Sequence, residues 1–175
     1  PTGLSFNNGV LSGTPQVNLT TTPFTVFANN SGGSVNQSFN ITINEPLVIL
    51  ATIADQIFTR NTSIPTLMVA TSVGVPETWG LSPALPAGLV FDNGTLSGTP
   101  LVNMTATLYT IYANNSGGSV NTTFSLTVNE PLVQLEQHPD RVFTRGLVAG
   151  PVITNFSEGT PASWGISPAL PLGLT

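Results

Sequence analysis

The chain repeats itself without a gap, with a period of about 85 residues. When residues 1–90 are aligned with residues 86–175, 49 of the 90 positions are identical. Among the shared segments are ANNSGGSVN at 28–36 and 113–121, and LSGTP at 11–15 and 96–100. An ungapped period of this length indicates one folding unit copied along the chain, so each structural element expected in one copy is expected again one period later.

Alternating apolar and polar residues indicate that the unit is built from β-strands. In residues 119–128 the apolar side chains fall on one face of an extended chain and Asn, Ser and Thr fall on the other. Nowhere does the pattern have the period of a helix, and short strands at this spacing are typical of a β-sandwich. Seven strands are predicted in one unit, at 47–51, 65–71, 77–82, 89–92, 95–98, 107–114 and 119–128.

Turn and core positions follow from the same pattern. Asn93-Gly94 and the Asn-Ser-Gly-Gly run at 115–118 are predicted hairpin turns, because Asn and Gly tolerate the backbone angles that such turns require. Trp79 and its counterpart Trp164 are predicted to anchor the core from the third strand. Tyr112 and its counterpart Phe27 are predicted to point outward, where they could stack on a sugar or pack against a neighbouring subunit.

A proline after the last strand sets the boundaries of the unit. Pro131 in Asn-Glu-Pro cannot donate a hydrogen bond to a strand ladder, so the preceding strand is expected to end there. One complete unit is therefore expected at 47–131, with the second half of another unit at 1–46 and the first half of a third at 132–175. Because the chain starts and stops within a unit, we expect it to be a segment of a longer protein.

The motifs of the unit resemble a known family. SPALPAGLVFDNGTLSGTP at 82–100 and LYTIYANNSGGSVNTTFSLTV at 108–128 are similar to the bacterial and archaeal "putative Ig" repeats, which are cadherin-like. The resemblance implies an all-β fold of tandem immunoglobulin-like β-sandwich repeats, found in adhesins, surface-layer proteins and other exported proteins. It implies no catalytic residue. Many cadherin-like relatives carry Asp-rich calcium motifs between domains, and this sequence has none of them.

The chain has few charged residues and many uncharged polar ones. Only 11 of the 175 residues are charged and none is lysine, whereas Ser, Thr and Asn together number 56. Typical soluble surfaces carry about 25–35% charged residues, so we expect this surface to be covered by attached sugar or by copies of the chain. The net charge of −5 argues against nucleic acid as a partner. The longest apolar run is too short to span a membrane.

N-glycosylation sequons are the strongest functional signal. Ten of the 16 asparagines lie in Asn-x-Ser/Thr, where the frequency of Ser and Thr would give about four. Three pairs keep the repeat register, and most sites fall in expected turns or on an outward strand face, where a glycan has room. A preference of Asn, Ser and Thr for turns is the alternative explanation. The candidate sites are Asn18, Asn29, Asn36, Asn40, Asn61, Asn93, Asn103, Asn114, Asn121 and Asn155.

Few other residues suggest chemistry. The single histidine, His138, has no candidate nucleophile or orienting group, so we expect no enzyme activity and no cofactor. Four acids keep the repeat register: Glu45 with Glu130, and Asp55 with Asp140. They could form an interdomain calcium site, or they could cap strands and form ion pairs, with Asp55 facing Arg60 and Asp140 facing Arg145. The ion pairs are the preferred interpretation.

These features favour a structural role outside the cell: an N-glycosylated fibre, stalk or surface layer built from tandem repeats. The alternative is an adhesin module that binds carbohydrate or a surface ligand, with the divergent segment 61–71, equivalent to 146–156, as its candidate contact region. A third hypothesis is a spacer in an exported enzyme. The expected partner is the protein itself, either as a continuous polymer, which is preferred, or as neighbouring copies that complete each other's domains.

Overall fold

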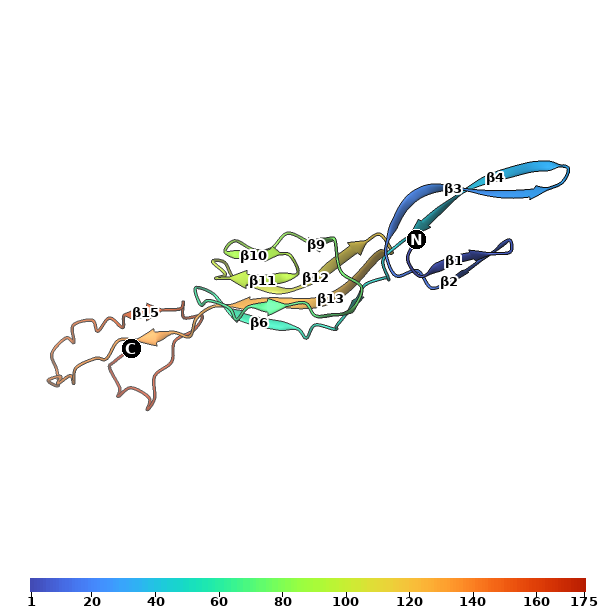
Figure 1. The fold of residues 1–175 in the computed structure, drawn as a ribbon. Coiled ribbons are helices and arrows are strands. Elements are labelled where there is room, and N and C mark those ends of the chain that lie inside the picture. The colour runs from blue at the N-terminus through green and yellow to red at the C-terminus, as the bar shows by residue number, and fades with distance from the viewer.

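The computed structural model describes all 175 residues. It contains 15 strands and no helix. The chain is elongated, with a central sandwich between two more open ends (Figure 1). We name residues 48–129, which contain strands β5 to β13, the central sandwich. Strands β1 to β4 precede it as the N-terminal hairpins, and residues 132–175 follow it as the C-terminal segment. No helix is present that is long and apolar enough to cross a membrane.

Two sheets face each other in the central sandwich. One has the order β6-β13-β12-β9 and the other the order β10-β11-β7, while β5 and β8 form a separate short pair. All pairings are antiparallel except that of β6 with β13, which is parallel. The strands are β5 (Ile49–Leu50), β6 (Gln56–Thr59), β7 (Leu67–Met68), β8 (Thr71–Val73), β9 (Thr78–Ser82), β10 (Leu89–Asp92), β11 (Thr95–Gly98), β12 (Met104–Asn115) and β13 (Gly118–Asn129).

This strand order is that of an immunoglobulin-like sandwich. In the immunoglobulin lettering, β5 is strand A, β7 and β8 together are B, and β9 to β13 are C to G. One face of the sandwich then contains A, B, E and D, and the other contains C, F and G, with β6 added beside G. The sequence therefore predicts the fold class correctly. Seven strands were expected where the structure has nine: β6 was missed, and the expected strand at 65–71 is divided into β7 and β8.

The buried core lies entirely within the central sandwich. All 13 buried residues fall between 48 and 128, and 11 of them are hydrophobic. Tyr109 and Phe124 stack with ring centroids 5.8 Å apart. Leu96 reaches them from the opposite sheet and is 1% exposed. Since burying such a side chain stabilises a fold by about 1.5–3 kcal/mol, most of the packing free energy of this chain resides here.

The predicted hairpin turns are confirmed. Asp92 pairs with Thr95, and between them Asn93 and Gly94 have φ angles of 45° and 77°, the left-handed values that a two-residue hairpin needs. Asn115 pairs with Gly118 across the second turn. The outward orientation of Tyr112 and Phe27 is also confirmed, because both side chains are exposed.

The two ends reproduce only part of the unit. The N-terminal hairpins are β1 (Leu4–Asn7) with β2 (Val10–Gly13), and β3 (Leu19–Asn30) with β4 (Gly33–Ile43). They are the counterparts of β10 to β13, one repeat period earlier. In the C-terminal segment, β14 (Gln134–Leu135) pairs with β15 (Phe156–Glu158), the counterparts of β5 and β8. Each of these pairs has both of its strands in the same half of the unit.

The predicted core position is correct for one tryptophan and wrong for the other. Trp79 is half-buried against the core and meets Phe91 edge to face, with ring centroids 6.3 Å apart. Trp164 is 58% exposed. The difference arises because Trp79 lies on β9, which pairs with β12, whereas residues 163–167 around Trp164 have no strand to pair with.

Candidate glycosylation sites and the repeat junction

The ten sequon asparagines are spread over the surface and do not form one cluster. Nine are exposed and Asn114 is half-buried. Asn36 and Asn40 lie on β4 and Asn121 on β13, while Asn61 and Asn93 occupy tight turns with positive φ. Attachment of a bulky sugar requires an exposed asparagine, and nine of the ten residues meet this condition.

Asn114 differs from its counterpart Asn29 because a strand covers it. Asn114 lies at the end of the strand predicted at 107–114, within β12, and is paired on one side with Ser119 and on the other with Thr78. Its Nδ2 donates to the Thr78 hydroxyl oxygen at 3.1 Å. Asn29 lies at the equivalent place on β3 and is exposed, since residues 163–167 do not pair there.

Two sequons stand directly across a strand pair from an exposed aromatic ring. Asn121 is opposite Tyr112 in the pairing of β13 with β12. Asn36 is opposite Phe27 in the pairing of β4 with β3. Directly opposed residues on one face of an antiparallel pair have Cβ atoms about 4.5–5.5 Å apart. A sugar attached at either asparagine therefore starts within reach of the neighbouring ring.

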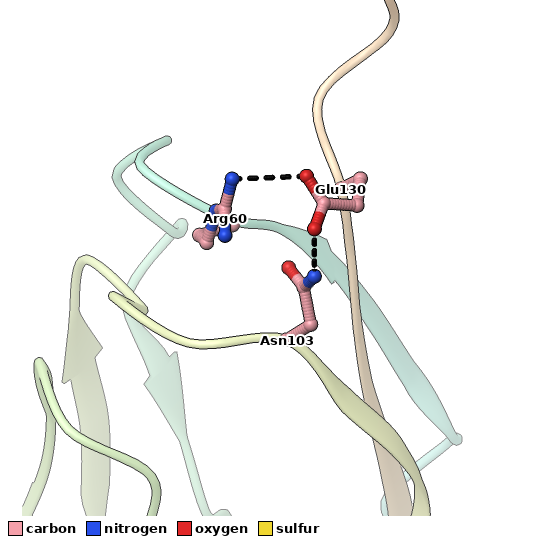
Figure 2. Close-up of polar contacts among 3 residues, drawn as sticks. All are labelled: Arg60, Asn103 and Glu130. Atoms are coloured by element: carbon pink, nitrogen blue, oxygen red, sulfur yellow. Dashed lines mark hydrogen bonds and ion pairs between the residues drawn. The ribbon is translucent and has the colours of Figure 1, made fainter. Parts of the chain in front are cut away.

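Arg60, Asn103 and Glu130 form a polar cluster at the end of the central sandwich (Figure 2). Arg60 Nη2 lies 2.9 Å from Glu130 Oε2, and Asn103 Nδ2 donates to Glu130 Oε1. Glu130 immediately precedes Pro131, so the cluster ties the loop after β6 to the chain that leaves the sandwich. The predicted ion pair of Asp55 with Arg60 is wrong: Asp55 instead accepts the backbone N–H of Ser125 at 2.8 Å.

The start of the central sandwich has the equivalent acid without the arginine. Asn18 Nδ2 donates to Glu45 Oε1, as Asn103 does to Glu130. Arg145, the counterpart of Arg60, makes no ion pair, so its predicted contact with Asp140 is also absent. Glu45 and Glu130 therefore act as acceptors that close the end of a hairpin, and two sequon asparagines are their donors.

The linker into the central sandwich is held by the turn between β12 and β13. The backbone N–H of Glu45 donates to Ser116 Oγ at 2.8 Å, and Asn115 Nδ2 donates to the carbonyl of Pro46 at 2.8 Å. Gly117 lies so close to the linker that a Cβ there would be 2.3 Å from the carbonyl oxygen of Glu45. These contacts fix the direction in which one repeat follows another.

These sites do not have the geometry of a metal centre. No group of three or more His, Asp or Glu side chains is close enough to hold a metal ion. His138 lies in the C-terminal segment beside an open hollow lined by Leu135 and Trp164. Sequence reasoning did not predict that Arg60 pairs with Glu130. The available signal was that both residues recur one repeat period away, as Arg145 and Glu45.

Comparison with known families decides the classification. The family described as "Putative Ig domain" matches residues 1–44 and again residues 46–129, which is well over half of the chain. The chain belongs to this family. The two matched stretches lie in tandem, and the resemblance suggested by the sequence motifs is therefore correct. A search of curated proteins finds no match.

Solved structures with related architecture come from multidomain immunoglobulin proteins. The I67–I69 fragment of the titin I-band is 19% identical, with 78% of this chain and 62% of that chain covered, at a TM-score of 0.43. Sidekick-1 immunoglobulin domains 1–5 are 20% identical, with 74% and 30% covered, at 0.41. Drosophila OTK extracellular domains 3–5 are 16% identical, with 78% and 50% covered, at 0.41. The chain spans less than two thirds of the length of each.

Membership of this family sets the general class of the protein. Tandem immunoglobulin-like domains are typical of surface and extracellular proteins. The family is normally non-catalytic.

Proposed function

We propose that this putative-Ig chain is a structural segment of an extracellular fibre, stalk or surface layer whose surface is coated with N-linked glycans. The observation that carries the proposal is the exposure of nine of the ten sequon asparagines on a chain with only 11 charged residues. Attached sugars would supply the hydration that charged side chains provide on other proteins. The proposal assigns no catalytic residue.

The proposed stiffness of the array rests on the junction between successive repeats. A linker with hydrogen bonds from Asn115 and to Ser116 leaves little freedom between successive repeats. In a tandem array each repeat contacts mainly its neighbours, so a fixed junction repeated along the chain gives a stiff array. We take residues 1–46, 47–131 and 132–175 as the repeat boundaries of that array. The proposed partner is the protein itself, either within one continuous array or as neighbouring copies.

Two exposed aromatic rings favour glycosylation at the asparagines that lie opposite them. Tyr112 and Phe27 are exposed beside Asn121 and Asn36, where a ring would otherwise be left in water. A sugar with an apolar face covers such a ring as it leaves the strand. Among the ten sites, we therefore expect Asn36 and Asn121 to be occupied most completely.

Glycopeptide mass spectrometry on protein from its native source tests the proposal. We expect hexose-containing masses at Asn36 and Asn121 above all, and at most of the exposed sites. Unmodified asparagine throughout would contradict the glycosylated fibre and would bring forward the adhesin alternative, which a glycan-array binding assay then tests. Asn44 is followed by Glu45 and Pro46 and is not a sequon, so its peptide serves as the internal negative control.

A further inference from the structure

One sequon of the central sandwich lies at the junction with the preceding repeat. Its three residues, Asn114-Asn115-Ser116, span the end of β12 and the start of the turn to β13. Ser116 Oγ accepts the backbone N–H of Glu45 at 2.8 Å, and Asn115 Nδ2 donates to the carbonyl of Pro46 at 2.8 Å. Two of the three side chains of this sequon are therefore bonded to the linker that enters the sandwich.

The third side chain of this sequon, that of Asn114, is held against the neighbouring strand. Its Nδ2 donates to the Thr78 hydroxyl oxygen at 3.1 Å, and its backbone carbonyl accepts the N–H of Glu77 at 2.7 Å. Of the ten sequon asparagines, Asn114 is the one that is half-buried. All three side chains of this sequon are thus engaged within the protein.

Two glycines allow the linker to approach the sandwich this closely. A Cβ at Gly117 would lie 2.3 Å from the carbonyl oxygen of Glu45, and a Cβ at Gly74 would lie 2.5 Å from that of Pro46. Gly74 also has a φ of 66°, which residues with a side chain rarely adopt. The linker therefore runs between the turn that joins β12 to β13 and the loop before β9, with no room for a side chain at either glycine.

The turn that binds the linker takes its shape from a local hydrogen bond. The backbone N–H of Gly117 donates to Asn115 Oδ1 at 2.9 Å. In the turn between β3 and β4, which has the same sequence, the N–H of Gly32 donates to Asn30 Oδ1 at 2.8 Å. The Asn115 side chain thus orders the turn with its oxygen and binds the linker with its nitrogen. A site that is already ordered loses less conformational entropy when it binds.

We propose that Asn114, Asn115 and Ser116 form a clamp for the linker of the preceding repeat, and that this sequon stays unglycosylated in the folded protein. The inference rests on the proposed glycosylated fibre and deepens it, because it separates the sequons that carry the coat from the one that joins the repeats. A sugar on Asn114 would replace one of its two Nδ2 protons and add bulk at a half-buried position. The sequon pattern also requires a hydroxyl at its third position, and the Ser116 hydroxyl is already bound to the linker.

Hydrogen exchange at the backbone amide of Glu45 measures the clamp directly, because this amide donates to Ser116 Oγ. The 175-residue chain is produced in a host without N-glycosylation. We expect Ser116→Ala to raise the exchange rate of the Glu45 amide by about three- to tenfold, the effect of losing one hydrogen bond. Ser119→Ala is the matched control, because Ser119 is exposed in the same hairpin. The amide of Leu126, in the core, should stay slow in both variants and shows that they are folded. An unchanged rate at Glu45 in Ser116→Ala would overturn the clamp.

A change of shape alone gives a second test of the clamp. Gly117→Ala leaves the bonding side chains in place but sets its new Cβ against the carbonyl oxygen of Glu45. Gly32→Ala is the matched control, since its Cβ would meet only Asn30 Oδ1, at 3.2 Å. We expect Gly117→Ala to raise the exchange rate of the Glu45 amide at least threefold and Gly32→Ala to leave it unchanged. Equal rates in the two variants would contradict the close fit of the linker.

A sugar attached chemically tests whether the clamp and a glycan exclude each other. The chain has no cysteine, so Asn114→Cys and Asn121→Cys each provide one thiol. Each is alkylated in the unfolded state with an iodoacetamide derivative of glucose, in which the thiolate sulfur forms a bond to carbon and iodide leaves, and is then refolded. We expect the sugar at position 114 to raise the exchange rate of the Glu45 amide by about three- to tenfold over that of the unalkylated variant, and the sugar at position 121 to leave it unchanged. Equal effects at both positions would overturn the exclusion.

Protein from the native source allows the two sequons to be compared in one peptide. Chymotrypsin cleaves after aromatic residues, so cleavage after Tyr112 and Phe124 releases residues 113–124 with both Asn114 and Asn121. We expect the sugar at Asn121 and unmodified Asn114. A sugar on Asn114 as often as on Asn121 would overturn the assignment. Because the exchange measurements use a chain without N-linked glycan, the clamp can fail while the glycosylated coat stands, and the coat can fail while the clamp stands.

Discussion

Arg60 and Glu130 lie 70 residues apart in the sequence, and their side chains meet at 2.9 Å where the polypeptide leaves the central sandwich. Their side chains are 29% and 38% exposed. The parallel pairing of β6 with β13 brings them together, because it places Thr59 opposite Asn129. The ion pair therefore reports whether this edge strand is in place.

Removing the arginine charge should loosen that edge. We expect Arg60→Gln to lower the free energy of unfolding of the central sandwich by up to about 1 kcal/mol, as for other partly exposed pairs, with a smaller loss in high salt. Chemical denaturation at two salt concentrations measures the effect. Arg141→Gln is the matched control, since Arg141 is exposed and makes no ion pair. An equal loss in both variants would show that the pair does not stabilise the edge.

The two copies of one leucine should respond differently to truncation. Leu96→Ala empties a fully buried site, and we expect it to cost about 2–5 kcal/mol of unfolding free energy. Leu11→Ala, at the equivalent position of the N-terminal hairpins, should cost far less, because its side chain is already 43% exposed. Thermal unfolding of the two variants side by side gives the comparison, and similar losses would contradict the unequal burial.

The Asn-Gly turns allow a similar comparison. Gly94 and Gly9 have φ angles of 77° and 83°, so alanine at either position is strained by about 1–2 kcal/mol. Only at Gly94 does the new Cβ also meet an indole ring, that of Trp79. We expect Gly94→Ala to lower the melting temperature more than Gly9→Ala and to change the near-ultraviolet dichroism of Trp79. Identical behaviour would show that Trp79 does not cover this turn.

Burial of one phenol makes the central sandwich sensitive to alkali. Desolvation raises the pKa of Tyr109 above its ordinary value of 10.0. Above about pH 10 the unfolded chain loses this proton while the folded chain keeps it, so stability falls as pH rises. We expect Tyr109→Phe, which copies Phe24 of the other repeat, to lose less stability than the wild type between pH 8 and pH 11. A parallel decline in both proteins would assign the alkaline effect to other groups.

The sequence predicts most of the pairings between strands that are neighbours in the chain. Alternation predicts the hairpins of β10 with β11 and of β12 with β13, together with the turn signals Asn93-Gly94 and Asn-Ser-Gly-Gly at 115–118, because both strands of each pair are neighbours in the chain. β6 was missed because its four residues pair in parallel with a strand about 70 positions away, which leaves no nearby turn signal. The partner of Arg60 was assigned wrongly for the same reason. Trp164 shows a different limit, since a residue type suited to a core is exposed when its strand partner is absent.

The two ends of the chain are unequal in how much structure they already possess. β1 to β4 are complete hairpins, and hairpins form locally within about 1–10 microseconds. Apart from the pair of β14 with β15, the C-terminal segment has its strand-forming residues unpaired. The central sandwich is divided in the same way, because β10 to β13 form two hairpins while β6, β7 and β9 pair with strands of the other half of the unit. The second half of each repeat is therefore the ordered surface on which the strands of the first half fold.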